Sequence, residues 1–212
     1  GLPVEQRGTV NVQATLDWIK GQPFTRFSEL VLMGCSAGSL GVQAWANEML
    51  IQMGETYGYD VAAVVPDSYA GVFPPETEGV TIKGFGACGK VGPLASSDAL
   101  RDKCDAGELE LEDMNDEAMT QFPETTYSFL NSKDDEVQIA YYVAIAVTFP
   151  NTTDEISPSE YYQQVNTIFD GYSGYKNVVE YLVQSDQHCY TNNNHFWVAD
   201  ATGSNGGGDG QT

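Results

Sequence analysis

The fold is decided by the stretch Glu29–Gly38, which reads ELVLMGCSAG. Its first half, residues 29–33, is a short apolar run bounded by turn residues, typical of a strand buried in a parallel sheet. The small residues 34–38 then indicate a sharp turn, and residues 40–53 follow a helical pattern that stops at a glycine. A strand, a tight turn and a helix in this order predict an α/β fold.

The turn has the pattern Gly-x-Ser-x-Gly, with Ser36 at its centre. In this pattern strained backbone angles project the serine hydroxyl at the edge of the sheet, and small neighbours such as Gly34 let the strand and the helix approach each other. Ser36 is therefore predicted to be a nucleophile, and the amide N–H of Ala37 a donor to the oxyanion. Gly34 is expected to line the same site. The alternative is a tight turn with a structural role only.

A serine hydroxyl needs a base, and the chain has two histidines, His188 and His195. His188 directly follows the last expected strand, in a loop where a catalytic imidazole belongs in this kind of sheet. His188 is therefore predicted to be the base, and His195 a packed or surface histidine.

The group that orients the base is expected to be an aspartate after an earlier strand. Asp135 follows the β-prone residues 125–130 and is the first candidate. Asp67 ends the preceding strand and is the alternative, whereas Asp134 is so close to Asp135 that spacing alone does not exclude it. Asp67 and Ser68 are also expected to line the substrate site.

The remaining elements alternate along the chain. Further strands are expected at residues 61–65, 125–130 and 178–183, and helices at residues 10–19, 115–121, 136–147 and 158–169. This alternation predicts an α/β-hydrolase-like, mostly parallel sheet with helices on both faces. Residues 71–124 are rich in Gly, Pro and acid and are expected to form an irregular cap or lid, and residues 203–212 a disordered Gly-rich tail.

The position of the turn sets a further expectation about domain organisation. In α/β-hydrolases several strands precede the nucleophile, but here the turn comes at residue 36. Residues 1–202 are therefore expected to be the C-terminal portion of a single domain whose N-terminal strands are not in this chain. The missing half, or another chain of an assembly, is then an expected partner.

Composition excludes some classes of partner. The chain has 30 acidic residues against 9 basic ones, a formal net charge of -21. Such a surface repels phosphate backbones, so no nucleic acid is expected as a partner. No apolar run approaches the roughly 20 residues that cross a bilayer, so no membrane span is expected.

The cysteines and one sequon indicate an oxidising compartment. Cys88 and Cys104 lie in a Gly-rich, strand-poor stretch and are expected to form a disulfide, whereas Cys35 is expected to be buried inside the turn. No pair of cysteines has the spacing of a zinc site, so no metal is expected. Asn151 begins a glycosylation sequon. These features predict an extracellular protein.

Four motifs, in this order, resemble those of the pectin acetylesterase and Notum family of carboxylesterases. Residues 34–38 resemble its G-C-S-A-G-G nucleophile motif, with Ser39 in place of the second glycine. Residues 64–73 resemble its D-S-x-G-x-F block, and residues 135–138 its D-x-x-Q acid motif, which favours Asp135 over Asp134. Residues 187–189 resemble its final histidine block, which supports His188.

The resemblance implies a secreted esterase that removes short acyl groups, most often acetate, from polysaccharides without a metal or an organic cofactor. The family's N-terminal glycine-rich motif, which supplies further oxyanion donors, is absent from this chain. Loss of one such donor costs about 100- to 1,000-fold in rate, so weak activity is expected from this chain alone. A catalytically weak or inactive interaction subunit is therefore the alternative function. A lipase-like enzyme for long acyl chains is a third alternative and is less favoured, because the 71–124 region shows no apolar lid helix.

Overall fold

The computed structural model of the chain describes residues 7–150, 152 and 155–198. The sequon residue Asn151 and the Gly-rich residues 203–212 lie outside the described residues. No helix in the described part combines the length and the hydropathy needed to span a bilayer.

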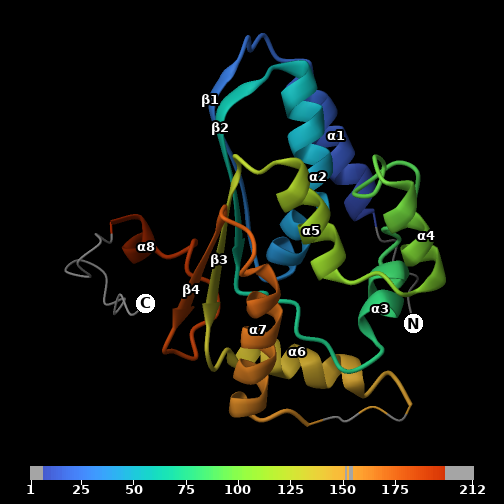
Figure 1. Ribbon diagram of the computed structural model, residues 1–212, viewed down its shortest axis with the longest axis vertical. Helices are drawn as coiled ribbons and strands as arrows, with labels where there is room; N and C mark the ends of the chain where they lie inside the picture. Colours follow the sequence, from blue (N-terminus) through green and yellow to red (C-terminus); the bar gives the residue numbers. More distant parts are fainter. Residues whose placement is uncertain (1–6, 151, 153–154, 199–212) are drawn as a thin grey trace.

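Strands and helices alternate along most of the described chain (Figure 1). The elements are α1 (Gly8–Lys20), β1 (Phe27–Cys35), α2 (Ala37–Thr56), β2 (Tyr59–Asp67), α3 (Glu78–Gly84), α4 (Asp98–Ala106), α5 (Leu111–Gln121), β3 (Thr126–Ser132), α6 (Glu136–Ala146), α7 (Pro158–Tyr172), β4 (Val178–Val183) and α8 (Asn194–Val198). The four strands form one sheet in the order β1-β2-β3-β4, and all neighbours are parallel. The α/β architecture with a parallel sheet is thus confirmed.

The core lies between one face of the sheet and the helices α2, α5 and α7 (Figure 1). Alternate strand residues, among them Val64, Tyr127 and Phe129, are buried on this face. The ring of Phe129 packs against Tyr172 and Phe169 of α7, with centroids 5.4 and 5.3 Å away. Burial of apolar side chains between the sheet and these helices is therefore the main source of stability.

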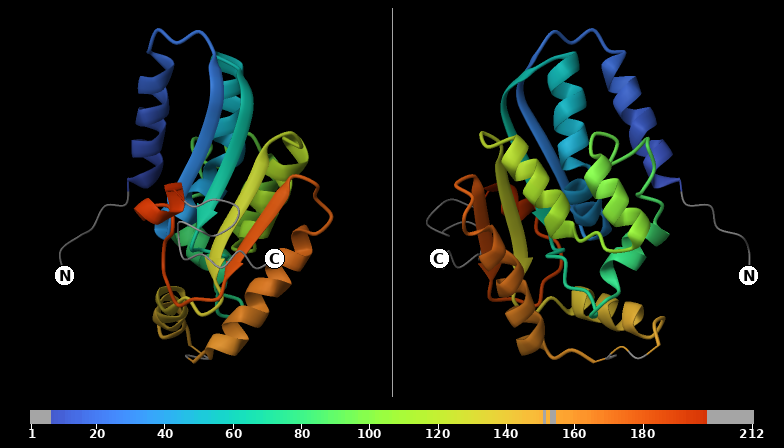
Figure 2. Two further views of the ribbon diagram at one scale, coloured as in Figure 1. Left: turned by 90° about the vertical axis from the view of Figure 1, so that its left-hand side faces the viewer. Right: turned by 45° about the vertical axis from the view of Figure 1, so that its right-hand side comes forward.

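The other face of the sheet is largely open, as the left view of Figure 2 shows. Val31 is 52% exposed, Val61 59% and Tyr181 57%. Within the described residues, α8 is the only helix on this side of the sheet (Figure 1). This differs from the expectation of helices on both faces. Parallel sheets are usually covered on both faces, so the open face is an unusual apolar surface.

Residues 71–124 are more regular than the sequence predicted, because they contain three helices in place of one. Ala118 and Met119 of α5 belong to the main core, so this helix is part of the body of the domain and not of a lid. A second apolar cluster surrounds Leu94, Cys104 and Leu109, and the expected Cys88–Cys104 disulfide is present there. The helix α4 was missed because it is short and mostly polar, with its signals confined to its caps at Ser97 and Gly107.

The core position of Phe129 leads to a first prediction. Phe129→Ala is expected to lower the free energy of unfolding by about 3–5 kcal/mol, because the void left between Tyr172 and Phe169 is enclosed. Val31→Thr, on the open face, is expected to change it by less than about 0.5 kcal/mol. Urea denaturation followed by circular dichroism measures both. A large loss for Val31→Thr would mean that the open face is covered in solution.

The half-buried carboxyl of Glu78 leads to a second prediction. Burial raises the pKa of Glu78 to about 9, and the neighbouring carboxylate of Glu112 adds to the rise. Since the usual value is 4.5, folding takes up a proton, and stability falls as the pH rises from about 4.5 to about 9. Glu78→Gln keeps an oxygen for the N–H of Leu111, which lies 2.8 Å from the glutamate oxygen. The variant is expected to be more stable than the wild type at pH 8.

Chemical denaturation between pH 5 and pH 9 measures this effect, and the stability of Glu78→Gln should depend less on pH in this window. Glu29→Gln, on the exposed part of β1, is the matched control for the loss of one charge. If the free energy of unfolding of Glu78→Gln changes with pH as steeply as that of the wild type, the raised pKa of Glu78 is contradicted.

Candidate active site

Ser36 lies in the turn between β1 and α2 with φ 59° and ψ -123°. A positive φ is strained for a residue with a side chain, and such strain is concentrated at functional sites. A Cβ on Gly34 would overlap the backbone carbonyl of Gly38, so the turn requires glycine at position 34. The N–H groups of Ser39 and Leu40 donate to the carbonyl of Ser36, 2.8 and 3.2 Å away, and start the helix.

The N-terminus of α2 lies directly after the serine. The amide N–H of Ala37 is one of the first groups of this helix, which have no acceptor within the helix. Such groups, together with the helix dipole, attract negative charge. The local geometry can therefore hold an anion next to the hydroxyl of Ser36.

The structure brings His188 and Asp135 together. The Nδ1 atom of His188 lies 3.0 and 2.9 Å from the two carboxylate oxygens of Asp135. The side chain of Asp135 is fully buried, and that of His188 is 17% exposed. Because the carboxylate accepts a hydrogen bond from the Nδ1–H group, the other ring nitrogen, Nε2, is left as the acceptor. Nε2 is buried and has no hydrogen-bond partner among the described residues.

Asp135 is held by the start of α6. It is the N-cap of this helix, and its Oδ1 atom accepts from the N–H groups of Val137 and Gln138 at 3.1 and 3.0 Å. The side chain of Gln138 donates to the Oδ2 atom of Asp135 at 2.9 Å and to Asn131 at 2.6 Å. A carboxylate with this many donors is both compensated for its burial and fixed in orientation.

A disulfide joins the two halves of the site. It links Cys35, directly before Ser36, to Cys189, directly after His188, and the two Cα atoms are 5.6 Å apart. Cys35 is therefore half-buried and bonded, which corrects the expectation of a buried cysteine inside the turn. A ring nitrogen of His188 and both sulfur atoms lie within 4.8 Å of one another. The imidazole thus lies beside the turn that carries the serine.

Among the described residues, Cys35, His188 and Cys189 are also the only cluster of metal-ligating residue types. The sulfur atoms are joined to each other in the disulfide, and a metal ligand has to be a thiolate. The two cysteines are therefore linked covalently in this structure and offer no thiolate to a metal.

Asp67 and Ser68 contact the loop after His188. The Oδ2 atom of Asp67 accepts from the N–H groups of Tyr190 and Thr191 at 2.8 and 2.7 Å, and from the hydroxyl of Thr191 at 2.7 Å. The hydroxyl of Ser68 accepts from the N–H of Cys189 at 2.8 Å. Asp67 and Ser68 are both fully buried, which differs from the expectation that they line a substrate site. Asp67 is bound to the loop backbone, whereas His188 is bound to Asp135.

Asp134 and His195 are the remaining candidates. The carboxylate of Asp134 accepts from the side chain of Gln184 at 3.3 Å in an exposed position. The backbone of His195 belongs to α8, beyond the loop. Of the two histidines and three aspartates considered, the structure therefore pairs His188 with Asp135.

A phenol next to the site stays neutral. Burial raises the pKa of Tyr190, and the carboxylates of Asp135 and Asp67 add to this rise. Its hydroxyl pairs with that of Ser132, which also donates to the backbone carbonyl of Gln187. These bonds hold the loop around His188 against Ser132 at the end of β3.

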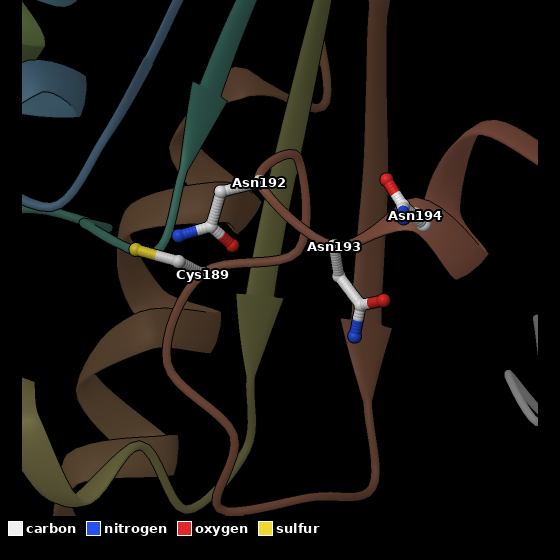
Figure 3. Close-up of a pocket in the computed structure, with 4 residues that line it drawn as sticks. All are labelled: Cys189, Asn192, Asn193 and Asn194. Atoms are coloured by element: carbon white, nitrogen blue, oxygen red, sulfur yellow. The ribbon is translucent and has the colours of Figure 1, made fainter.

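A hollow of about 540 Å³ lies beside Cys189 (Figure 3). It is lined by Cys189 and by three consecutive asparagines, Asn192 to Asn194. Asparagine amides both donate and accept hydrogen bonds, so the hollow is suited to a polar ligand rather than to an apolar one.

No model of a known protein family, no curated protein and no solved structure matches this chain.

Sequence reasoning missed the Cys35–Cys189 disulfide and the contacts made by Asn131 and Thr191. Two cysteines 154 residues apart give no local signal, although each is a direct neighbour of a candidate catalytic residue. The spacing of Asp135 and Gln138 did carry a signal, because residues three apart at a helix start can bond each other.

The two disulfides are expected to differ in effect. Cys35→Ser with Cys189→Ser should lower the free energy of unfolding by about 5 kcal/mol, because this link closes a chain segment of 154 residues. Cys88→Ser with Cys104→Ser removes a link that closes only 16 residues and should lower the free energy of unfolding by about 3 kcal/mol. Guanidinium denaturation of both double variants measures the difference. Equal losses would contradict a stabilisation that grows with the length of the closed segment.

Proposed function

We propose that this chain carries the nucleophile, base and acid of a secreted serine carboxylesterase of the α/β-hydrolase type. The observation that carries the proposal is the His188–Asp135 pair with a buried, unpartnered Nε2, tied by a disulfide to the strained turn at Ser36. A serine needs a base that a third group orients, and the His188–Asp135 pair supplies both. Two disulfides are compatible with an extracellular location.

In the proposed reaction the hydroxyl of Ser36 attacks the ester carbonyl, and Nε2 of His188 takes its proton. Asp135 keeps the imidazole in the required tautomer through Nδ1 and stabilises the imidazolium that forms. The N–H of Ala37 donates to the oxyanion. His188 then gives the proton to the leaving alcohol, and water hydrolyses the acyl-enzyme by the same route in reverse.

The proposed substrate is a polysaccharide with short acyl groups, most often acetyl, as the resemblance to pectin acetylesterases and Notum implies. The asparagine-lined hollow beside Cys189 supports a polar, hydroxyl-rich substrate. A net charge of -21 favours a neutral substrate over a strongly anionic one. No cofactor takes part in the proposed steps.

A second candidate function is that of a hydrolase-like interaction subunit with little activity. The open face of the sheet favours it, because Val31, Val61 and Tyr181 leave an apolar surface that a partner could cover.

Labelling with a fluorophosphonate probe tests the catalytic proposal. The wild type is expected to be labelled at Ser36, and Ser36→Ala to lose the label, because the probe reacts with an activated serine. Asp135→Asn is expected to slow both labelling and 4-nitrophenyl acetate hydrolysis by up to about 10⁴-fold. Ser28→Ala, at an exposed position in the same strand as the turn, is the matched control and should behave as the wild type.

Two outcomes would count against the esterase. A label that persists in Ser36→Ala would place the reactive group elsewhere. A folded wild type that is neither labelled nor hydrolytic would favour the interaction subunit.

A further inference from the structure

Asp67 contacts both halves of the site, although it takes no part in the proposed proton transfers. Its backbone carbonyl accepts from the N–H of Ser36 at 2.9 Å. Its carboxylate accepts from the N–H groups of Tyr190 and Thr191, which follow His188 in the chain. One residue at the end of β2 therefore bonds to the segment with the nucleophile and to the segment with the base.

The carboxylate of Asp67 is fully buried, and all its recorded hydrogen bonds come from neutral groups. Its Oδ1 atom accepts from the hydroxyl of Ser68 at 2.9 Å, while Oδ2 takes the three bonds from Tyr190 and Thr191. Bonds to a charged acceptor are about twice as strong as neutral ones. A buried charge left without them is costly, so the loop is held firmly against Asp67.

Ser68 extends this contact by one residue. It has a positive φ of 57°, and its hydroxyl accepts from the N–H of Cys189 while donating to Asp67. Three consecutive N–H groups, those of residues 189–191, therefore point at the Asp67–Ser68 pair. A run of three bonded amides defines the direction of the chain, which a single disulfide at Cys189 does not.

The geometry points to Asp67 as a positioning residue of the proposed esterase, which fixes Ser36 through its carbonyl and the His188 loop through its carboxylate. The inference rests on the proposed function for what this alignment achieves. It replaces the expectation that Asp67 lines the substrate site or acts as the acid. Since a misplacement of about 1 Å can cost about 100-fold in rate, the alignment of hydroxyl and imidazole is a sensitive quantity.

Asp67→Asn tests the assignment, because the amide has the same shape but lacks the charge and one of the two acceptor oxygens, so its NH2 group has to face either the loop N–H groups or the hydroxyl of Ser68. The kcat for 4-nitrophenyl acetate is expected to fall about 100-fold while KM changes little, and fluorophosphonate labelling should slow by the same factor. The low-field proton signal of the His188 Nδ1–H group bonded to Asp135 is expected to broaden or shift. Asp60→Asn, an exposed aspartate of the same strand that pairs with Arg26, is the matched control and should behave as the wild type.

The two readouts separate this inference from the proposed function. Unchanged kinetics in a folded Asp67→Asn protein, or a loss of activity with an unchanged His188 signal, overturns the positioning role. If the wild type has no esterase activity, the proposed function fails, and the His188 signal alone decides whether Asp67 positions the loop.

Thr191→Val covers the case in which Asp67→Asn does not fold. It removes one hydroxyl donor to Asp67 and keeps the shape of the side chain. A loss of about 10-fold in kcat with a shifted His188 signal supports the role. Wild-type values for both overturn it.

Discussion

The parallel pairing of the strands aligns their carboxyl ends, and the candidate site depends on this alignment. Cys35 at the end of β1 lies opposite Asp67 at the end of β2, and Asp67 lies opposite Leu130 in β3. Backbone bonds continue the ladder past the strands, from the N–H of Ser36 to Asp67 and from the N–H of Ser68 to Leu130. Segments about 30 to 100 residues apart in the chain therefore meet at one edge, which is where parallel α/β sheets carry their sites.

Two fully buried carboxylates, those of Asp135 and Asp67, lie at this edge. They have different hydrogen-bond partners and therefore different roles. Asp135 meets an imidazole, so its charge can stabilise a proton on His188. Asp67 meets backbone N–H groups, so its charge holds a loop in place. Both are compensated without a lysine or an arginine, which suits a chain with few basic residues. A buried carboxylate thus either stabilises a proton on a neighbouring imidazole or holds a loop in place, according to the donors around it.

The local features of the fold could be predicted from the sequence, whereas most of the long-range ones could not. The four strands follow from short apolar runs, and the Gly-x-Ser-x-Gly turn follows from residues that are adjacent in the chain. The short polar helix α4 and the Cys35–Cys189 link have no such signal, since one depends on its caps and the other on the complete sheet. The position of Asp67 at the end of a strand marks it as a candidate site residue, but its partners at residues 190 and 191 follow only from the three-dimensional structure.

The disulfide beside Ser36 also has a consequence for how the chain matures. Its cysteines are 154 residues apart, so an unfolded chain seldom brings them together, whereas Cys88 and Cys104, 16 residues apart, meet often. The nearby pair can therefore oxidise early, while the distant pair has to wait until β1 and the segment after β4 are assembled. Contacts between such distant segments form slowly, so the last oxidation is coupled to the completion of the fold. The thiol content of a maturing chain would thus report how many of the molecules have an assembled site.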